Sequence, residues 1–282
     1  MLKSLLPFAV PFGVALAATA AIRLIGAPGE KEPGRGARWA GLGVALGFLA
    51  GWIALLDQPW VPLDALSRVL HVGVGGVLLG IVLDLTQSRR LVGHVLIAIY
   101  AVGCAGASAM GGLTFKSIGF DHIVVGAVLA VLWFAVIAKL RALAQHPPTG
   151  LTVAVAAAVG LGVVAAIVGD RTIVMASAAL ALSLLGFAVV AALRPLPMTG
   201  VVAATAGGTL TALGWAFDQR HPDMVLALAL LILVLFAART AQRIPMPQAK
   251  IRGVLYVAAL AGICAIPIVL AAILTLAALP SK

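Results

Sequence analysis

Apolar runs of about 20 residues, long enough to cross a bilayer core as helices, recur along the whole chain. No other feature restricts the possible folds as much. The 282 residues are 63% hydrophobic and only 10% charged, whereas about 25% of the residues of a soluble domain are charged. The sequence therefore predicts an all-α polytopic membrane protein and excludes a soluble fold.

We expect about ten transmembrane helices, all belonging to a single transmembrane domain that covers residues 1–282, because the loops are too short for a soluble domain. The first run ends without a good cleavage site and is expected to be retained as a helix. The predicted spans are 5–22, 39–56, 65–83, 91–109, 121–140, 150–168, 171–193, 199–217, 223–241 and 252–279.

The distribution of Lys and Arg among the loops predicts an orientation. The six basic residues on the side of the two termini are Lys3, Arg68, Lys116, Arg171, Arg220 and Lys282, and the other thirteen of the 19 fall on the opposite side. Cytoplasmic loops carry the excess of positive charge. We therefore expect both termini outside and the basic loops in the cytoplasm, in a bacterial-type inner membrane.

The net charge of +10 does not indicate a nucleic-acid partner. The basic residues lie at helix ends, where positive charge sets topology and meets anionic lipid headgroups. Within the spans, glycines occur in close groups such as Gly73, Gly75, Gly76, Gly207 and Gly208. Small residues of this kind predict close helix packing, and a channel or carrier is the less favoured interpretation.

Two apolar segments meet at Arg194-Pro-Leu-Pro, where a proline ends the helix and the chain turns at the membrane surface. Around this joint, Gly186, Phe187, Gly200 and Gly208 have the ungapped spacing of a signature that resembles the polyprenyl-phosphate N-acetylhexosamine-1-phosphate transferases, membrane enzymes of the glycosyltransferase family 4 type. The resemblance implies their helical scaffold and their reaction, the transfer of a sugar phosphate from a UDP-sugar to a lipid phosphate.

Two further segments are similar to motifs of this family. Gly80 to Leu91 resembles a segment with paired aspartates, of which Asp84 is kept and Leu83 replaces the neighbour. Paired carboxylates would take a proton or help to hold a cation. A single Asp beside Arg89 and Arg90 is more typical of a solvated ion pair.

The segment from Trp133 to Leu151 resembles a motif with two asparagines and a catalytic aspartate. In this chain Lys139 and Ala142 stand at the asparagine positions and Gln145 at the aspartate position. A glutamine amide is neither a nucleophile nor a useful base. After Gly200, where the family has a magnesium-binding aspartate, the chain has Val201, which offers no oxygen ligand.

We therefore hypothesise a catalytically inactive relative of these transferases, without a cofactor, that acts as a structural or lipid-binding subunit beside another membrane protein. The expected ligand is a membrane lipid such as a polyprenyl-phosphate. Its phosphate would meet basic residues of the cytoplasmic face: Arg89, Arg90, Lys139, Arg141 and Arg194.

Two alternatives remain open at this point. One is an active transferase with displaced catalytic residues, in which Asp84 is the remnant candidate and Mg²⁺ would be required. The other is a small transporter, which predicts charged residues deep in the bilayer.

Overall fold

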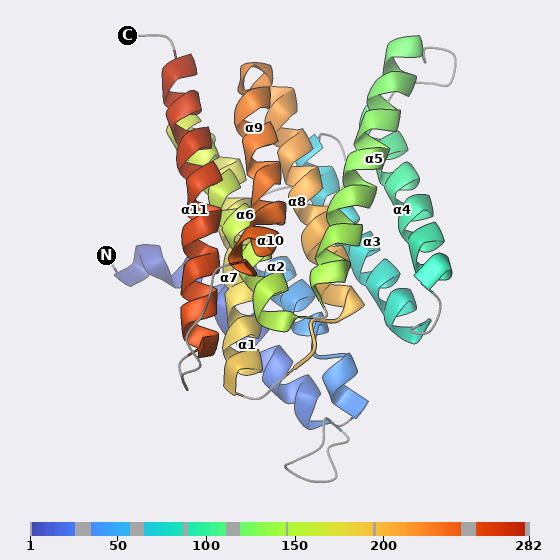
Figure 1. Ribbon diagram of the computed structural model, residues 1–282, viewed down its shortest axis with the longest axis vertical. Helices are drawn as coiled ribbons and strands as arrows, with labels where there is room; N and C mark the ends of the chain where they lie inside the picture. The colour runs from blue at the N-terminus through green and yellow to red at the C-terminus, as the bar shows by residue number, and fades with distance from the viewer. Residues whose placement is uncertain are drawn as a thin grey trace.

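The computed structural model describes residues 2–25, 35–56, 65–86, 90–110, 119–144, 146–193, 196–243 and 252–279. These ranges contain helices and no strand (Figure 1). Nine stretches of them are long and apolar enough to cross a membrane. The expected all-α polytopic membrane architecture is confirmed for this part of the chain.

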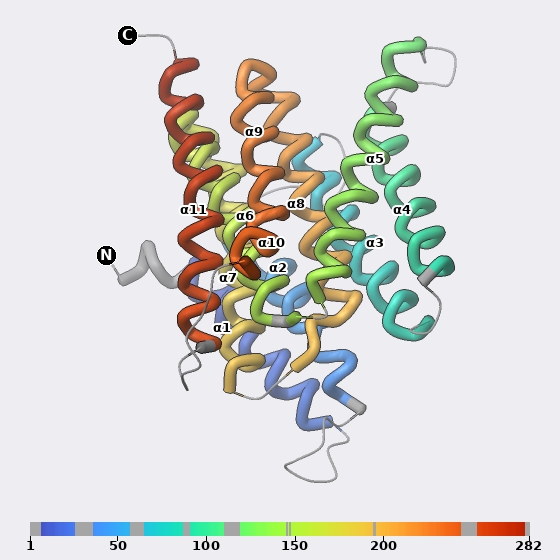
Figure 2. Tube along the Cα trace, in the orientation of Figure 1, coloured from blue at the N-terminus to red at the C-terminus, as the bar shows by residue number. Residues whose placement is uncertain are grey.

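The described helices follow one another along the chain from the N-terminus to the C-terminus (Figure 2). The full-length spans are α1 (Leu2–Leu24), α3 (Ala65–Leu85), α4 (Arg90–Met110), α5 (Phe120–Leu143), α6 (Pro147–Val168), α7 (Arg171–Leu193), α8 (Gly200–Arg220) and α11 (Arg252–Ala278). The ninth is composite and consists of η3 (Pro222–Met224), α9 (Val225–Ile232), η4 (Leu233–Phe236) and α10 (Ala237–Ala241).

The second of the ten predicted spans is shorter than expected. After η1 (Arg35–Arg38), α2 (Leu42–Leu55) has only 14 residues, about 21 Å of helix against a hydrocarbon core of about 30 Å. Its glycines at every fourth position lie against its neighbours. A Cβ on Gly47 would come within 2.6 Å of the Ala15 side chain on α1, and one on Gly51 within 2.8 Å of Ala179 on α7.

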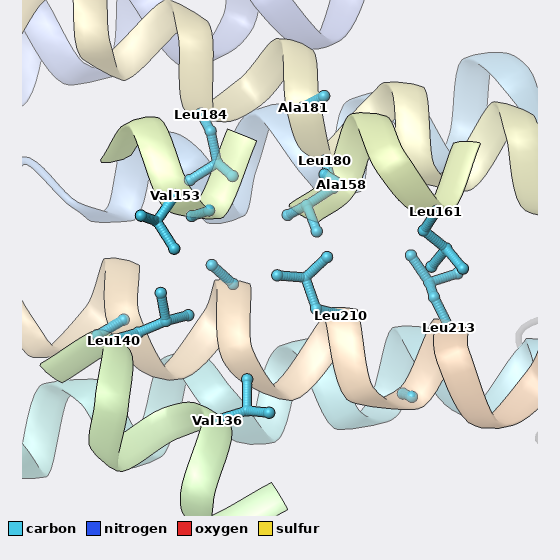
Figure 3. Packing of buried hydrophobic residues seen from close by; sticks show 14 of the residues in the cluster. Val136, Leu140, Val153, Ala158, Leu161, Leu180, Ala181, Leu184, Leu210 and Leu213 are labelled. Carbon is cyan, nitrogen blue, oxygen red and sulfur yellow. The ribbon is translucent and has the colours of Figure 1, made fainter. Parts of the chain in front are cut away.

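Helix α8 lies at the centre of the bundle, and 83% of this span is buried compared with 22% for α11. It packs against α3, α5, α6 and α7. Figure 3 shows Leu210 and Leu213 on α8 pointing toward Ala158 and Leu161 on α6. Since residues 200–213 of α8 are buried, the N–H groups at the start of this helix must be satisfied by protein groups rather than by solvent.

Helices α3 and α8 approach through a glycine face on α3. A Cβ added to Gly76 would lie 2.8 Å from the carbonyl oxygen of Ala204, and one added to Gly80 would overlap the backbone of Val201. The predicted use of small residues for close packing is thereby confirmed at this contact. Gly75 differs, because it faces Tyr100 on α4 instead.

Successive spans from α3 onward run in opposite directions, so their ends gather at two ends of the bundle (Figure 1). The basic end, at the bottom of Figure 1, contains the ends of α3 and α5 and the starts of α6, α8 and α11. The opposite end contains the α6–α7 turn and the end of α8. The assignment of the basic end to the cytoplasm, and of both termini to the outside, stays a prediction.

Candidate functional site

The end of α3 and the start of α8 meet through Asp84, the acid that the sequence singled out. One Asp84 carboxylate oxygen accepts the Gly200 N–H at 2.6 Å, and the other accepts the Val201 N–H at 3.2 Å. The Thr199 hydroxyl oxygen accepts the next N–H, that of Val202, at 3.4 Å. Together Asp84 and Thr199 satisfy the first three free N–H groups of α8.

This arrangement follows from the way the chain enters α8. Residues 196–199 are non-helical, with Leu196 and Met198 buried and Thr199 in an extended conformation at the N-cap. The buried side chains hold the segment against the protein, so the start of α8 cannot reach water. A carboxylate is well suited to this position because the N-terminus of a helix carries a partial positive charge.

The two apolar residues at the acidic positions of the family motifs are part of the core. Leu83 is 2% exposed and Val201 is 0% exposed, and Val201 lies directly against Gly80. They therefore pack α3 on α8 and offer no ligand to a cation or a phosphate.

Arg141 approaches the same place from α5. Its guanidinium occupies the space beside Gly93 on α4, where a side chain would overlap it, and it interacts electrostatically with Asp84. The Asp84 carboxylate thus lies between the positive end of α8 and a basic residue. The prediction from the sequence was instead an ion pair of Asp84 with Arg89 and Arg90. The helix-capping role was not predicted.

Lys139 and Arg141 do not form one binding site. Residues two apart on a helix point in different directions, and the Lys139 Nζ lies 5.0 Å from the ring centroid of Phe236, next to α10. Ala142 is exposed. Gln145, Arg89 and Arg194, together with the side chain of Arg90, lie outside the described residues.

The Asp84 surroundings do not fit the magnesium ion that the resemblance associates with catalysis. Both carboxylate oxygens already accept backbone N–H groups, whereas Mg²⁺ needs oxygen ligands in a near-octahedral shell. Within the described ranges, no three His, Cys, Asp or Glu side chains gather where a metal could bind. The other acidic residues of these ranges are on helix ends at the opposite end of the bundle: Asp121, Asp170, Asp218 and Asp223.

A groove that the sequence did not predict lies among α5, α6, α8 and α9. Its volume is about 330 Å³, and its walls are mainly Val, Leu and Ala side chains. Val128 and Ile232 line it and are 62% and 36% exposed, so it opens on the outer surface of the bundle. A Cβ on Gly214, which also lines it, would meet no atom within 4 Å.

Lys139 marks the basic end of this groove. It follows Val136, a lining residue, by three positions and so lies on the same side of α5 one turn further on. Phe236, the partner of Lys139, directly follows the lining residue Leu235. At the other end of the groove, Asp218 is the one acid among the described lining residues.

At the opposite end of the bundle, Asp170 connects three helices. It accepts the Ile173 N–H at 3.1 Å and so caps α7, and it pairs with Arg220 at 3.2 Å and with His221 at 3.4 Å. Burial alone would raise the pKa of Asp170. The Ile173 N–H and Arg220 outweigh it, and the pKa is lowered below its usual value. This cluster fixes the α6–α7 turn to the end of α8.

No protein-family model matches this sequence, and no curated protein matches it.

Proposed function

We propose that this protein is a non-catalytic, lipid-binding subunit of a membrane assembly, built on a scaffold related to the polyprenyl-phosphate sugar-phosphate transferases. The apolar chain of the lipid lies in the groove among α5, α6, α8 and α9. The phosphate of the lipid pairs with Lys139 at the basic end. The observation that carries the proposal is the apolar groove, together with Lys139 one helical turn beyond the lining residue Val136 and in contact with Phe236.

The groove has the dimensions and chemistry of a site for part of a lipid chain. Its volume of about 330 Å³ is at the lower limit of small-ligand pockets, about 300–1,000 Å³. It therefore takes a segment of a polyprenyl chain, with the remainder in the bilayer. Its opening past Val128 and Ile232 supports entry from the lipid phase.

The position of Lys139 supports an anionic headgroup. An ammonium near a helix end reaches the membrane surface, where phosphates are located. The Phe236 ring, at 5.0 Å, holds the Lys139 amine beside the groove by a cation–π contact. The phosphate would then contact Lys139, and the first part of the lipid chain would lie against Val136.

The state of Asp84 supports a protein without transferase chemistry. A general base or cation ligand needs a free oxygen, and both Asp84 oxygens accept hydrogen bonds from the start of α8. Releasing them would leave buried N–H groups without partners, at a cost of about 1–3 kcal/mol each. Asp84 is therefore better suited to holding α3 on α8 than to reacting.

The test titrates purified protein in mild detergent with a polyprenyl-phosphate and counts bound lipid by native mass spectrometry. Gly214→Leu places a side chain in the groove where no atom obstructs it, and we expect it to abolish binding. Lys139→Gln should weaken binding roughly tenfold, the effect of losing one charge-assisted contact.

Two matched variants act as controls. Gly262→Leu adds the same bulk on α11, also at a glycine with no atom within 4 Å of a Cβ, and Arg239→Gln removes an exposed charge at the same end as Lys139. Both should bind as the wild type does. Unchanged binding by Gly214→Leu would reject the groove, and unchanged binding by Lys139→Gln would reject the phosphate contact.

Two further measurements address the subunit role and the active-enzyme alternative. We propose that mild extraction copurifies a second membrane protein. Isolation of a lone, lipid-free monomer contradicts the subunit role. Membranes containing the protein should form no product from a labelled UDP-sugar and polyprenyl-phosphate with Mg²⁺. Product that disappears in Asp84→Asn would establish the transferase alternative.

A further inference from the structure

A second cavity lies between α3 and α4, toward the opposite end of the bundle from Lys139. Its volume is about 400 Å³. One part of its wall is polar and close to the ends of the two helices, because Arg68 is near the start of α3 and Ser108 is near the end of α4. The other lining residues are His71, Val72, Gly75, Tyr100, Gly103, Cys104 and Ala107.

Arg68 brings a positive charge to this cavity. One guanidinium nitrogen donates to the Ala107 carbonyl oxygen at 3.2 Å, which places the group across the mouth between the helices. In the described part of the chain, no carboxylate lies within ion-pair distance of it. A guanidinium has five N–H donors in a planar fork that fits a phosphate, and most of them remain available here.

Among the neighbouring polar groups, Ser108 adds a donor for an anion, and Tyr100 and His71 form part of the wall. Tyr100 uses its O–H to donate to the Val72 carbonyl oxygen at 2.6 Å, which fixes the ring as a wall of the cavity. The Nδ1–H of His71 donates to the Ser67 carbonyl oxygen at 3.2 Å, so this side chain is fixed against α3. The Ser108 hydroxyl adds a donor on the α4 side.

Below this polar mouth the walls are open and apolar. A Cβ on Gly103 would meet no atom within 4 Å. The faces on either side carry exposed apolar side chains, with Leu78 61% exposed on α3 and Ile99 65% and Val102 63% exposed on α4. Such faces lie against lipid in a membrane protein. An occupant should therefore be anionic at one end and apolar along the rest.

We propose that the α3–α4 cavity is a binding site for an anionic phospholipid, whose phosphodiester is held by Arg68 and Ser108 and whose acyl chain lies over Gly103. The site is separate from the groove among α5, α6, α8 and α9, at the other end of the bundle and between other helices. Its test is therefore independent of the proposed function.

The experiment compares phosphatidylglycerol with phosphatidylcholine of the same acyl chains, added to the full-length protein in mild detergent and counted by native mass spectrometry. The wild type should prefer phosphatidylglycerol. Arg68→Gln should weaken phosphatidylglycerol binding roughly tenfold and remove the preference, because it deletes a charge-assisted contact. Arg171→Gln, an exposed cation at the same end, should change nothing.

A second variant tests the cavity without altering charge. Gly103→Leu fills the open space and should displace the lipid, whereas Gly262→Leu on α11, where a Cβ also meets nothing, should not. A phosphatidylglycerol analogue with a photoreactive chain should label α3 or α4 in the wild type and lose that labelling in Gly103→Leu. Inorganic phosphate at millimolar concentration should not displace the lipid.

The possible outcomes separate clearly. Wild-type binding by Arg68→Gln, or labelling of α3 and α4 that survives Gly103→Leu, overturns the proposal. Displacement by inorganic phosphate overturns its lipid part and assigns the cavity to free anions. Loss of binding in Lys139→Gln, with Arg68→Gln unaffected, would place the lipid in the other groove and also overturns it.

Discussion

At the scale of the residue, Asp84 determines how the basic end is built. A single aspartate at the end of an apolar helix is compatible with an ion pair, a base or a cation ligand. Its bonds to the Gly200 and Val201 N–H groups, at 2.6 and 3.2 Å, make it a helix cap supplied by another helix. The half-buried carboxylate neutralises the positive end of α8.

Asp84→Ala should therefore destabilise the protein by at least about 2 kcal/mol, because the Gly200 and Val201 N–H groups lose their acceptor, at about 1–3 kcal/mol each. Asp84→Asn keeps one acceptor oxygen and should lose less. The measurement is thermal or denaturant unfolding in detergent, with Asp223→Asn, an exposed acid, as the control. Equal unfolding midpoints for Asp84→Ala and the wild type would show that the cap contributes nothing.

The lowered pKa of Asp170 predicts that the stability of the fold depends on pH. Because the pKa of Asp170 is lowered in the folded protein by the Ile173 N–H and Arg220 despite burial, the Asp170 carboxylate stabilises the fold above the unfolded pKa of about 3.9. This contribution is lost as the pH falls through the lowered folded pKa. Unfolding midpoints measured from pH 7 downward should fall below about pH 4 in the wild type. The part of that fall due to Asp170 should be missing in Asp170→Asn. Parallel curves for the two proteins would contradict this.

At the scale of the element, the contact between α3 and α8 depends on glycine. Helices in lipid associate by van der Waals packing, so the distance between their backbones matters more than the apolar area they bury. The face of α3 that contains Gly76 and Gly80 allows the backbone of α8 to come close. This approach also brings Asp84 within hydrogen-bonding distance of Gly200.

Gly80→Ala should separate the two helices, because the added Cβ would overlap the Val201 backbone. We expect a loss of more than about 2 kcal/mol, together with loss of the Asp84 cap. Gly262→Ala has open space around it and should be neutral or stabilise by up to about 1 kcal/mol. Unfolding in detergent measures both variants, and a neutral Gly80→Ala would disprove the close contact.

At the scale of the whole molecule, helix direction separates two chemically different ends. The basic end has Lys139, Arg141 and Arg239, and the opposite end has Asp170, Asp218 and Asp223. The two proposed lipid sites lie among different helices, one among α5, α6, α8 and α9 and the other between α3 and α4, and toward different ends. A protein with this arrangement can contact both leaflets of a bilayer at once.

The predicted orientation can be tested by cysteine labelling in intact cells. In a background without Cys104 and Cys264, a cysteine at exposed Arg171 should react with a membrane-impermeant maleimide, and a cysteine at exposed Arg243 should react only after lysis. The reason is the excess of Lys and Arg at the end that holds Arg243. The reverse pattern would place the basic end outside.

The amino-acid sequence by itself determined the fold class and the approximate helix positions. For runs of apolar residues, a membrane-spanning helix has a low free energy, because a helix satisfies its own backbone hydrogen bonds in lipid. Eight of the predicted spans correspond to single long helices, and the ninth in order, 223–241, corresponds to the composite stretch from η3 to α10. The span predicted at 39–56 is the exception, since α2 has 14 residues.

Only the tertiary structure decided what the candidate residues do. Asp84 became a cap because α8 begins beside it, 116 positions further along the chain, and no local pattern encodes that meeting. Lys139 and Arg141 are two positions apart, so their side chains point in different directions from α5, toward Phe236 and toward Asp84. The two cavities lie among α5, α6, α8 and α9 and between α3 and α4. Hydropathy records whether a residue avoids water, and it carries no information about which helix it will face.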